Sequence, residues 1–242
     1  MIEIKDVYKK YENSSYPALD HINLTINDGE LITVLGTSGC GKTTLIKAIN
    51  KLHDIDSGEI IIDHNNINDV DGVALRRTIG YVIQQVGLFP HMTIAENIAT
   101  IPELLKWEKD RINKRVDELL EMIDLPKEYK NRYPRELSGG QQQRVGLVRA
   151  LAADPHIVLL DEPFGAIDAI TREHLQDELI RIHKNGNKIF IFVTHDLNEA
   201  FKLGDKVIIM DKGRVEQFDT PDHIKAHPAT PFVKKLLGVA YD

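Results

Sequence analysis

The chain has 242 residues, of which 42% are hydrophobic and 28% charged, and its formal net charge is −7. This length and balance predict a soluble globular protein with one substantial core and room for an inserted subdomain. The acidic balance argues against a general nucleic-acid binder, because neutralising phosphates needs a basic face. The sequence has no apolar run near the about 18 residues of a membrane span. Its single cysteine cannot form an internal disulfide, which fits a reducing, cytoplasmic compartment.

The N-terminal part of the sequence predicts antiparallel β-structure. Residues 2–8 and 19–26 alternate apolar and polar side chains, as half-buried strands do. Tyr11 and Tyr16 lie in the loop between these strands, where an aromatic ring could stack on a purine. An ordinary surface position is the alternative for both, and spacing alone does not distinguish them. Residues 60–62 predict a further strand.

A glycine-rich stretch, residues 36–44, lies between an apolar strand and a helical segment. It has the pattern G-x-x-x-x-G-K-[ST], in which backbone N–H groups and a helix N-terminus surround a polyphosphate. The pattern assigns Lys42 to the β- and γ-phosphates and the Thr43 hydroxyl to Mg²⁺. A glycine-rich turn with a chance lysine is the alternative, and the strand before it and the helix after it argue against that. The candidate phosphate-binding residues are Gly36, Thr37, Ser38, Gly39, Cys40, Gly41, Lys42, Thr43 and Thr44.

Cys40 lies inside this stretch, close to the predicted helix N-terminus. That position predicts a lowered thiol pKa and a reactive thiol when no nucleotide is bound. The alternative, that Cys40 is simply a small side chain that fits the space in the loop, is at least as good an interpretation.

The middle of the chain interrupts the α/β rhythm. Residues 79–83 predict a buried strand, and Gln84 follows it, where ligands commonly bind in α/β sheets. Helices are then predicted at residues 94–106 and 109–123 from their apolar spacing. We therefore expect an inserted helical subdomain over residues 86–153.

The sequence Leu137-Ser138-Gly139-Gly140-Gln141 opens another predicted helix. Ser138 is a suitable N-cap for that helix. The N–H groups of the Ser-Gly-Gly turn could also bind an anion, although no lysine accompanies them. The residues by themselves favour the capped helix.

An apolar strand ends in Asp161 and Glu162, as expected of a parallel strand buried on both faces. Asp161 suits a water-mediated Mg²⁺ contact, and Glu162 could orient an attacking water and accept its proton. Two acids often follow a strand by chance, but less often downstream of a phosphate loop. Residues 188–193 predict the next strand, which places His195 at the same sheet edge as Asp161 and Gln84. The remaining predicted elements are a helix over 171–184 that stops at Gly186, a hairpin of 206–210 and 214–218, a short helix that begins at 220–222 and another short helix over 232–237.

These motifs together resemble, in order and along nearly the whole chain, the ATP-binding subunit of ABC transporters. The matching motifs are the phosphate loop, the Q-loop Gln84, the signature at 137–141, the Walker B run ending at Asp161 with the adjacent Glu162, the D-loop at 165–168 and the switch His195. The resemblance implies an α/β fold: a P-loop NTPase (RecA-like) core with a mainly parallel sheet, an N-terminal antiparallel β-subdomain and an inserted α-helical subdomain. It implies one ABC-type ATPase domain, with its catalytic core at 1–85 and 154–242 and its helical signature subdomain at 86–153.

The same resemblance implies a head-to-tail pair of subunits that encloses two ATP molecules with Mg²⁺. Glu162 would be the catalytic base, His195 would contact the γ-phosphate, and Gln84 would contact Mg²⁺ or water beside Thr43 and Asp161. The further residues expected to contact ATP are the adenine-stacking Tyr11 and, from the signature and D-loop, Ser138, Gly139, Gly140, Gln141 and Asp168. Thr37 and Ile167 depart from the usual proline and leucine of the family, and neither would touch phosphate through its side chain. Active hydrolysis is expected.

The finer resemblance is to importers of quaternary amine osmoprotectants such as glycine betaine, carnitine or choline. It is carried by residues 80–85, 87–93, 161–166 and 171–179. It implies an ATP-driven motor on the inner face of the cell membrane. The expected partners are a second copy, a membrane permease docked on residues 84–107 and, indirectly, an extracytoplasmic solute-binding protein, but no nucleic acid. Members often continue into paired regulatory domains, so a chain ending at Asp242 either lacks them or has been cut.

Other functions remain as alternatives. The chain could serve an importer of another solute, such as an amino acid or other small polar compound. It could be a soluble ABC protein acting on ribosomes or DNA, although the interval between Gln84 and Ser138 is too short for the usual coiled-coil insertion. It could also be a regulatory module without catalysis, which the presence of Glu162 and His195 disfavours.

Overall fold

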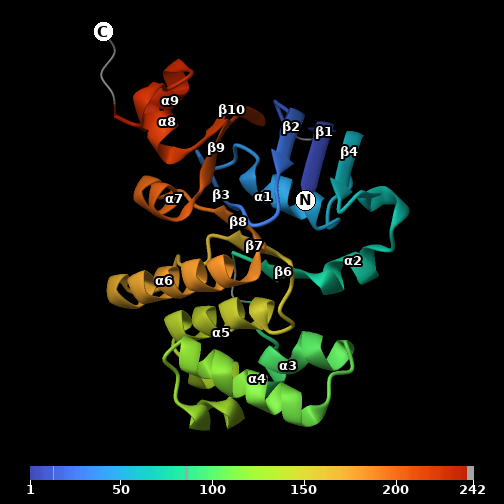
Figure 1. Ribbon diagram of the computed structural model, residues 1–242, viewed down its shortest axis with the longest axis vertical. Helices are drawn as coiled ribbons and strands as arrows, with labels where there is room; N and C mark the ends of the chain where they lie inside the picture. The colour runs from blue at the N-terminus through green and yellow to red at the C-terminus, as the bar shows by residue number, and fades with distance from the viewer. Residues whose placement is uncertain (13, 85–86, 239–242) are drawn as a thin grey trace. The chain divides into compact units, whose positions relative to one another are not determined.

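The computed structural model describes residues 1–12, 14–84 and 87–238 of the chain (Figure 1). Contacts between residues group the chain into two compact units. Unit 1 consists of Met1–Arg76 and Gly186–Asp242, and unit 2 is Arg77–Asn185. Gln85 and Val86, where the predicted helical subdomain begins, lie outside the described residues. The boundaries of the helical subdomain, residues 86–153, therefore stay a prediction.

Unit 1 contains an antiparallel sheet built largely from the N-terminal part of the chain. β1 pairs antiparallel with both β2 and β4, and alternate residues such as Ile2 and Ile4 are buried. This confirms the antiparallel strands predicted from the alternating pattern. The four strands, in the order β2-β1-β4-β5, are β2 (Leu19–Ile26), β1 (Ile2–Lys9), β4 (Ser57–Ile62) and β5 (Asn65–Asn66).

Unit 1 also contains parallel strands, and these position the phosphate loop. β3 (Leu31–Gly36) pairs in parallel with β8 (Ile189–Val193) on one side and with β9 (Lys206–Asp211) on the other. Every residue of β3 and β8 is buried, as continuous apolar runs predict for parallel strands covered on both faces. β9 forms the predicted hairpin with β10 (Arg214–Asp219).

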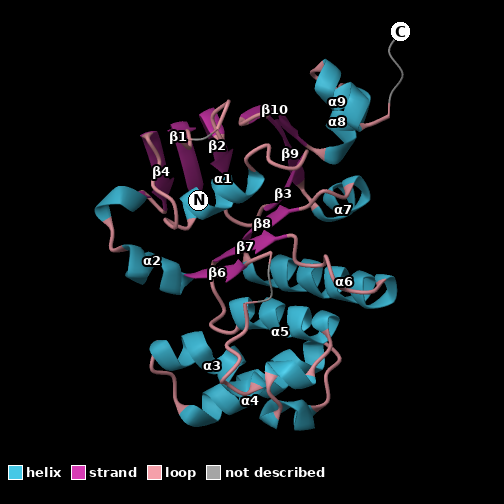
Figure 2. Cartoon of the chain, turned by 180° about the vertical axis from the view of Figure 1, so that it is seen from behind, coloured by secondary structure: helices cyan, strands magenta, loops and turns pink. Residues whose placement is uncertain are grey.

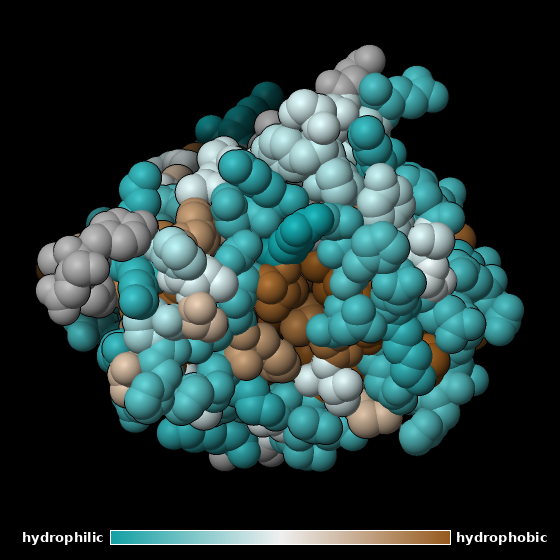
Figure 3. Space-filling view, turned by 90° about the horizontal axis from the view of Figure 1, so that it is seen from above, coloured by the Kyte–Doolittle hydropathy of each residue, from teal (hydrophilic) through white to brown (hydrophobic). Residues whose placement is uncertain are grey.

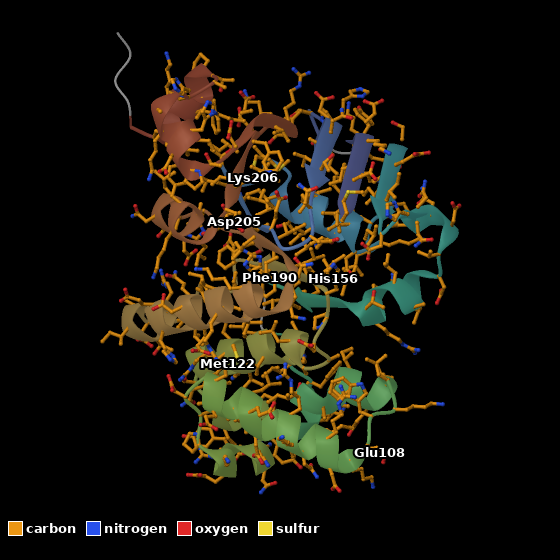
Figure 4. All side chains as sticks on the ribbon, viewed as in Figure 1. Glu108, Met122, His156, Phe190, Asp205 and Lys206 are labelled. Atoms are coloured by element: carbon orange, nitrogen blue, oxygen red, sulfur yellow. The ribbon has the colours of Figure 1, made fainter. Side chains whose placement is uncertain are left out.

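The amino ends of these parallel strands are fixed by a small polar network. The N–H of Leu31 donates to Asp205 Oδ2 at 2.8 Å, and Lys206 Nζ donates to Glu30 Oε1 at 2.7 Å. The N–H of Phe190 donates to the carbonyl of Glu30 at 3.1 Å. Figure 4 labels Phe190, Asp205 and Lys206 at this edge. The carboxyl ends of the same strands, which carry the candidate residues, therefore share the opposite edge.

The helices of unit 1 pack around these strands. A core cluster joins the strands to the C-terminal helices through Leu35, Val207, Ile224 and Val233, all of which are buried. Figure 3 looks onto this unit from above and shows hydrophobic residues gathered in a hollow among hydrophilic ones. The elements are α1 (Lys42–Ile49), η1 (Ile67–Asp69), α2 (Gly72–Thr78), α7 (Leu197–Leu203), α8 (Pro221–Ala226) and α9 (Pro231–Leu236), and α2 continues into the first residues of unit 2.

Unit 2 combines a parallel strand pair with helices. β6 (Ile79–Val82) pairs in parallel with β7 (Ile157–Asp161). Between residues 94 and 151 every described element is helical, and Figure 2 shows α3, α4 and α5 gathered together. These elements are α3 (Ile94–Leu104), α4 (Lys109–Met122), η2 (Lys127–Asn131), η3 (Pro134–Glu136) and α5 (Gly139–Leu151). In Figure 4, the labels of Glu108 and Met122 mark the two ends of α4.

The long helix α6 (Ala169–Gly186) differs slightly from its prediction. The sequence predicts that Gly186 stops the helix, but Gly186 is the last helical residue, and Asn187 takes the left-handed conformation with φ 47°. Asparagine tolerates this conformation better than most residues, so it ends the helix. Among the described residues, we find no helix that is both long and apolar enough to span a membrane.

Candidate functional site

The phosphate loop of unit 1 closes around the side chain of Lys42. Residues 36–44 connect β3 to α1, as predicted. Lys42 Nζ donates to the carbonyls of Gly36 at 2.8 Å and Thr37 at 2.9 Å, and Lys42 is only 6% exposed. Thr37, Ser38 and Gly39 face outward. The loop therefore holds the buried ammonium group of Lys42 behind three exposed residues.

Two glycines of this loop lie too close to neighbouring backbone for any side chain. A Cβ on Gly41, whose φ is +114°, would stand 2.1 Å from the carbonyl oxygen of Ala18. A Cβ on Gly36 would stand 2.2 Å from the carbonyl oxygen of Met210. Both contacts are far shorter than van der Waals distances. The glycines of the motif thus serve close packing as well as the loop conformation.

Cys40 is buried beneath the loop, and the predicted lowering of its pKa is wrong. The residue is 2% exposed, and this burial raises the thiol pKa by disfavouring the thiolate. Lys42, whose Nζ lies 3.9 Å from the sulfur, acts in the opposite direction but is outweighed. The interpretation of Cys40 as a small residue that fits its position is the one that the structure favours.

A maleimide reagent should therefore label Cys40 slowly at neutral pH, because a buried thiol is both protonated and inaccessible. Labelling should become fast once the protein is unfolded in denaturant, and ATP should protect little. The Cys40→Ser variant gives the background, since the chain has one cysteine. Rapid labelling of the folded protein that ATP suppresses would restore the reactive-thiol interpretation.

His195 lies beside the phosphate loop in unit 1. The parallel register pairs Val193 of β8 with Val34 of β3, and the N–H of Thr194 donates to the carbonyl of Val34 at 3.1 Å. His195 is the next residue and is exposed. Asp196 then caps α7 by accepting from two backbone N–H groups. The histidine is thus held between a strand and a capped helix, at the edge where β3 enters the loop.

The two candidate aromatic residues have different neighbours, although both are 37% exposed. The Tyr11 ring meets the His53 ring edge-on at 5.9 Å, and Lys9 Nζ lies 5.7 Å from its centroid. The Tyr16 hydroxyl lies 4.0 Å from the position that a Cβ on Gly39 would occupy. Tyr16 therefore adjoins the phosphate loop, and the choice of Tyr11 as the adenine-stacking residue stays a prediction.

In unit 2 the candidate polar residues meet at the end of the strand pair. The register pairs Val82 of β6 with Leu160 of β7, so Gln84 and Glu162 follow neighbouring strands. Gln84 Nε2 donates to Glu162 Oε2 at 3.3 Å. Asp161, at the end of β7, is 2% exposed. The part of the prediction that places Asp161 and Gln84 at one sheet edge is confirmed, and the position of His195 relative to them stays a prediction.

The turn after Glu162 is fastened by a residue that sequence reasoning missed. Gln143 of α5 donates from Nε2 to the carbonyl of Glu162 at 3.3 Å, and its Oε1 accepts from the N–H of Ala166 at 2.7 Å. It is 5% exposed. The sequence does contain a signal for this role. Gln143 is a polar residue on the apolar face of a predicted helix, one turn after Gly140, and a buried amide needs hydrogen-bond partners.

The start of α5 has the capped form predicted from its sequence. The N–H of Gln141 donates to Ser138 Oγ at 3.3 Å, and the N–H of Ser138 donates to Gln141 Oε1 at 2.9 Å, which together form a capping box. A Cβ on Gly140 would lie 3.0 Å from the carbonyl oxygen of Ala166. Around Gly139, nothing in the described part of the chain comes within 4 Å of such a Cβ. This face of the turn is open.

The D-loop residue Asp168 is exposed and caps the start of α6. Its Oδ1 accepts from the N–H of Thr171 at 3.0 Å, and this bond lowers the pKa of the Asp168 carboxyl. Ile167, the departure from the family pattern, is 4% exposed and packs into the interior. Ile170 is 85% exposed. The end of the D-loop and the first turn of α6 therefore expose one carboxylate, that of Asp168, and one large apolar side chain, that of Ile170.

Comparison with known proteins gives relatives along the whole chain. The family model described as ABC transporter matches residues 19–165. The choline transport ATP-binding protein OpuBA of Bacillus subtilis is 51% identical over 238 residues, covering 98% of this chain and 62% of that protein. The glycine betaine uptake system ATP-binding protein YehX of Escherichia coli is 45% identical over 238 residues, covering 98% of this chain and 77% of that protein.

A solved structure has the same fold. The ATP-binding cassette MJ0796, in a dimeric post-hydrolysis state bound to ADP and Pi, superposes with a TM-score of 0.84 at 37% identity. The match covers 91% of this chain and 99% of that one, and it confirms the predicted α/β fold class. The chain spans less than two thirds of the length of OpuBA. On this evidence from sequence and structure, the chain belongs to the ABC transporter family.

Proposed function

We propose that the chain is the ATP-hydrolysing motor of an ABC importer, coupled to a separate membrane permease. The observation that carries the proposal is the contact of Gln84 with Glu162 at the end of β7, in a chain that also holds an intact phosphate loop. It brings a proton acceptor, Glu162, and an amide oxygen suited to magnesium, that of Gln84, together where α/β proteins bind ligands. The names of the relatives support the transport role.

ATP would be held through its phosphates by the loop of unit 1. Lys42 and the backbone N–H groups of the exposed residues 37–39 would bind the phosphate oxygens, with the N-terminus of α1 adding partial positive charge. Thr43, Asp161 and Gln84 offer a hydroxyl, a carboxylate and an amide oxygen, the hard donors that Mg²⁺ prefers. When bound, Mg²⁺ supplies charge neutralisation at the β- and γ-phosphates. The donor chemistry of these residues fits the ion.

Hydrolysis would use Glu162 as the proton acceptor. Its carboxylate would orient a water molecule and take a proton from it as the water oxygen bonds to the γ-phosphorus, while the bond from that phosphorus to the β–γ bridging oxygen breaks and ADP leaves. His195, exposed beside the loop, would donate to a γ-phosphate oxygen, and Gln84 would orient Glu162 through the contact described above. Tyr11 would stack on the adenine.

A second copy would complete each ATP site. Ser138, Gly139, Gly140 and Gln141 of one subunit would contact the γ-phosphate held by the other, with Asp168 beside them. The open surroundings of Gly139 support this, because only a glycine allows very close approach of another backbone or a phosphate. The related cassette MJ0796 is dimeric.

The permease would dock on residues 84–107. This segment exposes large apolar side chains, including Phe89 at 41% and Leu104 at 49%, as a docking surface requires. Its loop is held in shape by Asn97, which is fully buried and bonds both the N–H and the carbonyl of Phe89. The chain would thus lie on the inner face of the membrane through the permease, with a solute-binding protein on the outer side.

The solute we propose is a quaternary amine, on the strength of the relatives' names. The test is reconstitution with the permease and solute-binding protein in liposomes, with ATP turnover measured against added solute. Glycine betaine, carnitine or choline should raise turnover, and an amino acid should not. Stimulation by an amino acid alone would overturn the solute, whereas co-purification with nucleic acid and no response to the permease would overturn the transport function.

A further inference from the structure

Gln143 makes two hydrogen bonds to one short turn of unit 2. Its Nε2 donates to the carbonyl of Glu162 at 3.3 Å, and its Oε1 accepts from the N–H of Ala166 at 2.7 Å. The two bonds close both ends of the five-residue turn from Glu162 to Ala166. Because Gln143 is 5% exposed, water competes little for either bond.

The turn needs such support at Glu162. This residue has φ 48°, in the left-handed region that residues other than glycine seldom adopt. Pro163 follows it and has no N–H to donate. The carbonyl of Glu162 accepts from Gln143 and also from the N–H of Gly165 at 3.3 Å. A residue kept in this conformation persists where its surroundings over-determine it, and Gln143 provides part of that constraint.

Gln143 also ties the turn to the start of its own helix. It lies one helical turn after Gly140, where a Cβ would come within 3.0 Å of the carbonyl oxygen of Ala166. The close contact at Gly140 and the bonds from Gln143 therefore hold the same turn against the first turns of α5. The carboxylate of Glu162, directed toward Gln84, is positioned by this arrangement.

We propose that Gln143 is a positioning residue for hydrolysis, which fixes the backbone of Glu162 so that its carboxylate meets the attacking water. This inference rests on the proposed function, in which Glu162 accepts the proton. Gln143 touches neither nucleotide nor water in this role. It acts through the carbonyl of Glu162 and the N–H of Ala166.

The chain offers a matched control for the loss of these bonds. Gln217 of β10 is 9% exposed, and its Nε2 donates to the carbonyl of His227 at 2.9 Å while its Oε1 accepts from the N–H of Ala229 at 2.9 Å. It thus bonds one carbonyl and one N–H, as Gln143 does, but away from the candidate site residues of unit 1. A comparison of Gln143→Leu with Gln217→Leu separates a loss of stability from a loss of positioning.

The experiment measures kcat and KM for ATP and the melting temperature of both variants. We expect Gln143→Leu to lower kcat by about 10- to 100-fold, since small displacements of a reacting group cost that much. KM for ATP should stay within a factor of about two, because the phosphate-binding groups are unchanged. Gln217→Leu should lower the melting temperature and leave kcat unchanged. Equal losses of kcat in the two variants, or a normal kcat in Gln143→Leu, would overturn the proposal.

Two further variants keep the test decisive if Gln143→Leu folds poorly. Gln143→Glu can still accept from Ala166, but when ionised it cannot donate to Glu162, so its kcat should fall as pH rises and recover as the carboxyl is protonated. In the Glu162→Gln background, Gln143→Leu should cause no additional loss, because the group that it positions is gone. A pH profile of Gln143→Glu like that of the wild type, or a further loss of kcat when Gln143→Leu is added to Glu162→Gln, would contradict positioning.

If the wild-type protein hydrolyses no ATP, the proposed function itself fails, and the positioning role of Gln143 fails with it.

Discussion

Replacing Glu162 with glutamine should lower the rate of ATP hydrolysis by about 10²- to 10⁴-fold, the usual contribution of a positioned general base. An amide has nearly the same size as the carboxylate but cannot accept a proton from water. ATP binding should persist, because the phosphate loop is untouched. In the presence of ATP the variant should accumulate as a dimer, since closed pairs would no longer be released by hydrolysis. Phosphate release and light scattering after size-exclusion chromatography measure the two effects.

Glu118→Gln is the control for this variant. Glu118 is a half-exposed acid of α4 whose ion pair with Arg115, at 3.5 Å, lies on the surface and contributes little. The Glu118→Gln variant should hydrolyse ATP as the wild type does and should not accumulate as a dimer. Wild-type turnover in Glu162→Gln would mean that another group accepts the proton.

Replacing Lys42 with methionine should abolish tight binding of ATP. Each charge-assisted hydrogen bond to phosphate is worth about 1.5–3 kcal/mol, or about 10- to 100-fold in affinity. Methionine keeps much of the buried stem but removes the charge and both bonds to the loop carbonyls. Titration with Mg-ATP in a calorimeter gives the change in dissociation constant.

Lys51→Met controls for the loss of a lysine that ties backbone together. Lys51 Nζ donates to the carbonyls of Ile67 at 2.8 Å, Asn68 at 3.3 Å and Val70 at 2.9 Å, in the same manner as Lys42 but outside the phosphate loop. This variant should unfold at a lower temperature and bind ATP normally. If both lysine variants lost ATP binding equally, the effect of Lys42→Met would reflect general destabilisation instead of a lost phosphate contact.

The parts of the molecule that could be predicted are those determined by short-range pattern. The continuous apolar run of β7 indicated a parallel strand buried on both faces, the runs of β3 and β8 indicated strands, and the serine before Gly139 indicated a capped helix. Gln84 and the two acids of unit 2 could be placed at one edge because neighbouring parallel strands align their carboxyl ends. Within each unit, the structure bears out these local expectations.

What could not be predicted depends on contacts between distant parts of the chain. The burial that raises the pKa of Cys40 comes with a loop packed against backbone near Ala18 and Met210. The bonds of Gln143 join residues 19 and 23 positions away. The short helix α2 is a different kind of omission, since Asp71, which accepts from the N–H of Ala74 at 2.9 Å before the helix, is also typical of a turn.

The bonds from Lys42 to the loop carbonyls also bear on the speed of nucleotide capture. A loop that already encloses an ammonium group has little conformational freedom left to lose when a polyphosphate arrives. When nucleotide binds, the ammonium group of Lys42 would give up its hydrogen bonds to the carbonyls of Gly36 and Thr37 and form hydrogen bonds to phosphate oxygens in their place. Association should accordingly resemble docking onto a rigid surface, with an on-rate limited by encounter and orientation instead of by loop folding.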